Sequence, residues 1–80
     1  MNLMIITLAR MAAVKAVKRD MRAQGLMLAH VEHRTIVAAA REYLRDHPEL
    51  IEQAAETVRN VPQLRTLAER IDRQYKAIQR

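Results

Sequence analysis

The fold is decided by residues 3–24, which read LMIITLARMAAVKAVKRDMRAQ and are followed by Gly25. Alanine, leucine, methionine and arginine, which dominate this stretch, are strong helix formers. Glycine readily adopts the left-handed conformation that closes a helix, and Lys18, Arg19 and Arg22 stand in the preceding turns, where cations suit the negative helix end. The sequence therefore predicts a helix over about residues 3–24.

Three further helices are predicted downstream, separated at two prolines. Pro48 and Pro62 each fit the first turn of a helix. The chain has one glycine and few aromatic residues, a composition that favours helix over strand. We expect an all-α protein, a single domain over residues 1–80 folded as a small three- to four-helix bundle. The predicted helices cover about residues 3–24, 29–46, 48–59 and 62–79.

The helices predicted after Gly25 are amphipathic. At 100° per residue, the apolar side chains of residues 62–79 fall in one stripe, whereas the outward side of residues 48–59 is acidic. That stripe contains Leu64, Leu67, Ala68, Ile71, Tyr75 and Ile78, and the acidic side contains Glu49, Glu52 and Glu56. For a chain of 9.3 kDa, size scaling predicts a folded surface of about 5,000 Å², which leaves room for one small core.

The opening helix is apolar on more than one side. Within residues 1–17, 13 residues are apolar, and Met4, Leu8 and Met11 lie apart from the main stripe. A helix that is apolar all round is buried in a larger core or at an interface, so we expect a homodimer through this helix. The predicted interface comprises Leu3, Met4, Ile6, Leu8, Met11 and Val14. The alternative is that the same side chains bind a different partner, another regulatory protein.

Membrane and targeting interpretations of this segment are weaker. The longest uncharged run is residues 1–9, far short of the ~20 residues that a bilayer span requires. Arg10 and Lys15 interrupt the apolar residues beyond that run, and the positive charge comes after the run instead of before it, unlike a secretory signal. We expect a cytoplasmic protein, with peripheral binding to an anionic membrane surface as the less favoured alternative.

Catalytic and metal-binding patterns are largely missing from the sequence. The chain contains no cysteine or serine and a single glycine, which removes the commonest nucleophiles, thiolate metal sites and phosphate-binding glycine loops. His30 and His33 are three residues apart, whereas the zinc-protease motif needs two histidines at i and i+4. We expect both to be partly buried structural residues or helix-start caps. The prediction is a non-enzyme without metal, cofactor or small-molecule substrate.

Charge is the most informative functional feature. The net charge is +5, and residues 1–45 carry all of this surplus. Basic side chains in two ridges, on the first and second predicted helices, are suited to contacting phosphates. The predicted contacts are Lys15, Lys18, Arg19, Arg22, Arg34, Arg41 and Arg45. Because aromatic stacking platforms are scarce, duplex DNA is the favoured ligand. The sequence predicts a small DNA-associated regulator of transcription, and the alternative is a protein–protein effector such as an inhibitor or anti-activator.

Overall fold

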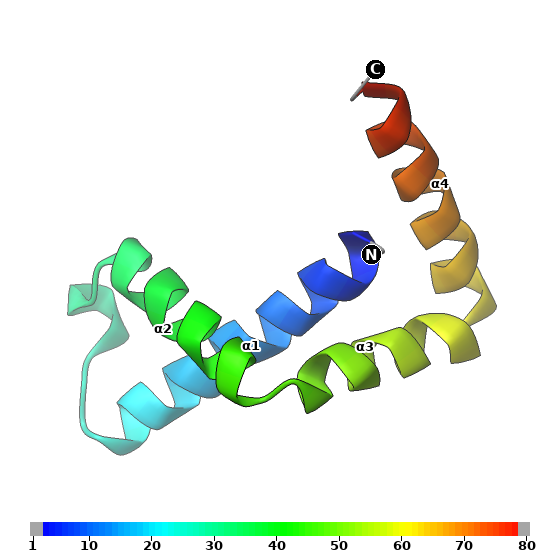
Figure 1. Cartoon of the computed structure of the whole chain (residues 1–80). Helices are drawn as coiled ribbons and strands as arrows, with labels where there is room; N and C mark the ends of the chain where they lie inside the picture. Colours follow the sequence, from blue (N-terminus) through cyan, green and yellow to red (C-terminus); the bar gives the residue numbers. More distant parts are fainter. Residues whose placement is uncertain (1–2, 79–80) are drawn as a thin grey trace.

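The computed structural model describes residues 3–78, and all regular secondary structure in that range is helical (Figure 1). The elements are α1 (Leu3–Ala23), the short 3₁₀ turn η1 (Leu28–His30), α2 (His33–Asp46), α3 (Glu49–Asn60) and α4 (Pro62–Ile78). No strand occurs in these residues. The prediction of a small all-α bundle is confirmed.

Gly25 closes α1 as the sequence predicts. Its φ is +84°, in the left-handed region that glycine adopts without strain. The amide of Gly25 donates to the carbonyl of Arg22 at 3.0 Å, and the amide of Leu26 donates to the carbonyl of Met21 at 3.0 Å. This pair of hydrogen bonds is the Schellman arrangement, which satisfies carbonyls that the end of the helix would otherwise leave without donors.

The second helix begins later than expected, at His33 instead of Ala29. Residues 28–30 form the 3₁₀ turn η1, in which the amide of His30 donates to the carbonyl of Met27 at 2.9 Å. Glu32 then takes an extended conformation at the N-cap of α2 and makes no side-chain capping bond. His30 and His33 are both exposed, so the expectation of partly buried or capping histidines is wrong.

The core is built from small side chains where α1 crosses α2 and α3. Ala13 and Val17 of α1 pack with Ile36 and Ala40 of α2 in one buried cluster. The other buried side chains are Ala9, Ala54, Val58 and Ala68. Among the described residues, no buried side chain is larger than isoleucine and none is polar. Alanines at the contact let the helices approach closely, but they bury little area per residue.

The molecule is more open than its size predicts. Its radius of gyration is 14.8 Å, against about 12 Å for a compact chain of 80 residues. Its accessible surface is 6423 Å², well above the ~5,000 Å² expected from its mass. Figure 1 shows the reason: α4 rises from the end of α3 and approaches only the start of α1. There the backbone amide of Leu3 donates to Oδ1 of Asp72 at 3.1 Å.

Candidate functional site

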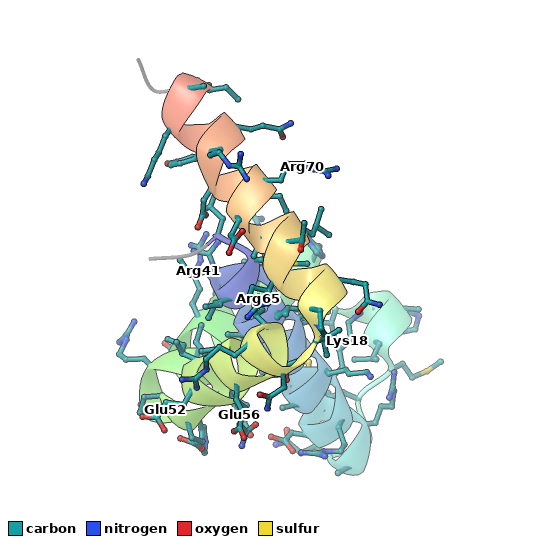
Figure 2. The ribbon with its side chains drawn as sticks, turned by 90° about the vertical axis from the view of Figure 1, so that its right-hand side faces the viewer. Lys18, Arg41, Glu52, Glu56, Arg65 and Arg70 are labelled. Carbon is teal, nitrogen blue, oxygen red and sulfur yellow. The ribbon has the colours of Figure 1, made fainter. Side chains whose placement is uncertain are left out.

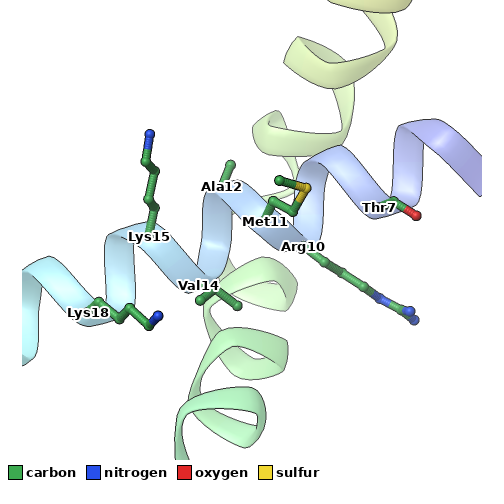
Figure 3. A pocket seen from close by; sticks show the side chains of 7 residues that line it. All are labelled: Thr7, Arg10, Met11, Ala12, Val14, Lys15 and Lys18. Carbon is green, nitrogen blue, oxygen red and sulfur yellow. The ribbon is translucent and has the colours of Figure 1, made fainter. Parts of the chain in front are cut away.

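The candidate site is the outer face of α1. Because Ala9, Ala13 and Val17 are buried, residues about half a turn away must face outward. Met11, Lys15 and Lys18 hold these positions, and they border an open hollow of about 650 Å³. Figure 3 shows long cationic side chains extending away from the helix around short apolar ones. The lining residues are Thr7, Arg10, Met11, Ala12, Val14, Lys15 and Lys18.

Two smaller hollows flank this face. On the α2 side, a hollow of about 170 Å³ brings Arg10 of α1 beside Arg41 of α2. Where α1 passes the junction of α2 and α3, a hollow of about 530 Å³ is lined by Lys15, Arg19 and Arg22, together with Tyr43 of α2 and Leu50 of α3. No aspartate or glutamate lines any of the three hollows. The surface is therefore cationic and partly apolar across α1 and the adjoining side of α2.

The seven predicted phosphate contacts fall into two groups. The structure brings five of them to the border of these hollows: Lys15, Lys18, Arg19, Arg22 and Arg41. The other two do not line any of the three hollows. Arg34 forms an ion pair with Glu32 at 2.6 Å, and Arg45 lies in the last turn of α2. Sequence reasoning missed Arg10, which joins the first two hollows. Its interruption of an apolar stripe was the one available signal.

The predicted apolar interface is more covered than expected. Five of its six side chains are half-buried within the chain itself: Leu3, Met4, Ile6, Leu8 and Val14. At the start of α1, the amide of Leu3 donates to Oδ1 of Asp72, so this end of the helix is in contact with α4. Met11 is the exception, with 61% of its surface exposed at the floor of the largest hollow. The apolar surplus of α1 is thus concentrated at its middle.

Sequence reasoning also missed exposed apolar side chains on α4. Leu67, Tyr75 and Ile78 belong to the apolar stripe predicted for residues 62–79, yet they are 41%, 44% and 82% exposed. Ala68, on the same stripe, is buried. The stripe is therefore covered near the middle of α4 and not at its last described turn.

The junction of α2 and α3 holds a small polar cluster. The ring of His47 stacks on Tyr43, with centroids 4.1 Å apart, and its Nδ1 lies 2.9 Å from Oε1 of Glu49. A backbone hydrogen bond at Glu49 and the bond to His47 lower the pKa of the Glu49 carboxyl below its ordinary value. Both side chains are well exposed to solvent, so this cluster shapes a helix start and offers no enclosed site.

Metal-binding clusters and membrane spans are both absent from residues 3–78. No three histidine or carboxylate side chains in this range gather closely enough to hold a metal ion. None of the described helices combines the length and the apolar character needed to cross a bilayer.

No family model, curated protein or solved structure matches the chain. Function is accordingly inferred from the surface of α1 and its surroundings.

Proposed function

We propose that this chain is a non-enzymatic, DNA-associated regulator that contacts the phosphates of duplex DNA through α1 and α2. The observation that carries the proposal is the gathering of cations around three hollows that no carboxylate lines. A polyanion meets no opposing negative charge there, and the long side chains reach outward from a rigid helix.

The dimensions of the cationic strip suit a phosphate backbone. Lys15 and Arg22 are seven residues apart, which corresponds to about 10 Å along a helix. Duplex DNA carries one negative charge per ~1.7 Å of its axis, so a strip of this length faces several phosphates. Arg41 widens the strip on the side of α2. We expect Arg34 to contribute least, because its guanidinium already pairs with Glu32.

The test is a titration of duplex DNA at about 50 mM and about 200 mM salt. We expect binding at the lower concentration that weakens steeply at the higher one, since each phosphate contact releases counterions. The double variant Lys15→Gln with Lys18→Gln is expected to reduce the salt slope by about two, one for each lysine that no longer binds a phosphate. Fluorescence anisotropy of a labelled duplex gives both quantities.

The matched control removes the same charge from another helix. Arg65 and Arg70 lie on α4, apart from Lys18 on α1 (Figure 2), and Arg65→Gln with Arg70→Gln is expected to keep the salt slope. Equal losses of affinity in both double variants would mean that net charge alone drives binding. Absence of binding at about 50 mM salt would remove the proposal altogether.

The second candidate function is that of a protein–protein effector. One observation favours it: the largest hollow has an apolar floor around Met11, which phosphate contacts do not require. Methionine adapts its shape to different partners. The same titration distinguishes the two functions, because an effector for a protein partner predicts no salt-dependent binding to DNA.

A further inference from the structure

We propose that a second copy of this chain covers the outer face of α1, and that it does so with the last turns of α4. In this arrangement, Ile78 and its neighbours on α4 of one copy seat in the hollow around Met11 on the other copy, and the contact is repeated in reverse. The proposal concerns self-association and does not depend on DNA binding.

The exposed area of a single copy is the first support. The surface of 6423 Å² exceeds the ~5,000 Å² expected for this mass by about 1,400 Å². If two copies each bury that excess, they bury about 2,800 Å² together. Obligate homodimers bury between about 2,000 and 5,000 Å². The excess accessible surface of one copy is thus comparable to the area that each subunit buries in a stable dimer.

The direction of the α4 stripe is the second support. Ala68 is buried and Ile71 is half-buried, so this side of α4 faces the rest of the molecule. At 100° per residue, Ile78 lies on the same side as Ile71, two turns further along. The start of α1 stands level with Asp72, where the amide of Leu3 is bonded. Ile78 lies further along α4 than Asp72 and is 82% exposed. The apolar stripe of α4 therefore continues beyond the point where α4 contacts the start of α1.

The charge around the hollow is the third support, because it opposes pairing of α1 with α1. Such pairing would bring Arg10, Lys15 and Lys18 of both copies together, with no carboxylate lining the hollow on either side. Like charges directly opposed across an interface are destabilising. On α4, Arg73 and Lys76 lie on the opposite side of the helix from Ile78, so the approach of the apolar stripe does not press these cations against the hollow. The apolar floor then receives an apolar side chain.

Reciprocity closes the assembly at two copies. Each copy has one α4 stripe and one α1 hollow. In a dimer with two-fold symmetry, each stripe binds the hollow of the other copy, so no binding surface is left over. The same contact without the two-fold axis would add copies without limit. Solution mass therefore tests both the contact and its symmetry.

The first experiment measures the mass of the full chain by sedimentation over a range of concentrations. We expect the chain to form a dimer. Met11→Lys and Ile78→Lys are each expected to weaken it at least tenfold, because each buries a charge in the contact. Met27→Lys is the matched control: Met27 is 65% exposed, close to the 61% of Met11, but lies in the connection after α1. It is expected to leave the dimer intact, and circular dichroism checks that all three variants are folded.

The second experiment mixes the two disrupted variants in equal amounts. Met11→Lys retains an intact α4 stripe, and Ile78→Lys retains an intact α1 hollow, so a mixed pair recovers one of its two contacts. We expect the mixture to dimerise more strongly than either variant alone. A mixture no stronger than its components would contradict the α4-to-α1 contact. A chain that stays monomeric, or a mass that rises beyond two copies, would overturn the proposal as a whole.

Discussion

Gly25 shows how one residue fixes a boundary in this fold. Its positive φ allows the hydrogen bonds that close α1, and an added Cβ would meet no atom within 4 Å. A side chain at this position would therefore destabilise the fold only through the strain of its backbone conformation, and not through a steric clash. Asparagine tolerates the left-handed region better than alanine does.

We predict that Gly25→Ala lowers the free energy of unfolding by about 1 kcal/mol, since an L-residue in this conformation is strained by ~1–2 kcal/mol and the unfolded chain loses some freedom. Gly25→Asn is expected to lose less. Urea unfolding followed by circular dichroism measures both. Equal losses of stability for the two variants would show that backbone strain is not the cause.

Single positions also mark where sequence reasoning reaches its limit. The proline at position 48, like Gly25, acts through local backbone geometry, and the boundaries near both can be predicted from neighbouring residues. The proximity of Arg10 and Arg41 arises from the crossing of two helices, which no local pattern encodes. Likewise, Arg34 is part of the basic ridge in the sequence, but it forms an exposed ion pair with Glu32 in the structure.

At the scale of elements, the start of α3 joins local chemistry to stability. Glu49 stands in the first turn, where a carboxylate interacts favourably with the positive end of the helix. Because the pKa of Glu49 is lower in the folded chain than its ordinary value of 4.5, its carboxylate stabilises the fold above that pH. This contribution disappears as the pH falls through the lowered pKa.

We predict that Glu49→Gln lowers the melting temperature near pH 7, and that the difference from the unsubstituted chain narrows at an acidic pH below the lowered pKa of Glu49, where the carboxyl is protonated. Glu56→Gln is the control, because Glu56 lies on α3 beyond the first turn. Thermal unfolding followed by circular dichroism at the two pH values measures the effect. A difference that is the same at both pH values would assign it to something other than the charge of Glu49.

The amphipathic pattern of α4 was predictable from the sequence, but the extent of its cover was not. A stripe defines which side of a helix is apolar, whereas the angle between helices decides how far a neighbour extends along that stripe. Ala68 is buried and Ile78 is not, although both belong to the same stripe. The prediction that α1 carries surplus apolar surface holds at Met11, while its first turns are half-buried.

At the scale of the whole molecule, self-association and folding are linked. A dimer that forms from folded chains raises apparent stability by mass action, so its melting temperature depends on protein concentration. We predict that the melting temperature of the unsubstituted chain rises with concentration, whereas that of Ile78→Lys does not. Differential scanning calorimetry at several concentrations measures this. A constant melting temperature for the unsubstituted chain would contradict the dimer.

The narrow seam of alanines between the helices has a thermodynamic consequence. Small interior residues expose little additional hydrocarbon when the chain unfolds, and exposed hydrocarbon is the main contribution that raises the heat capacity of the unfolded state. The stability of a lone copy accordingly varies gently with temperature, without a pronounced optimum. Any sharp curvature then originates in the docking of two copies, where the larger aliphatic groups leave water.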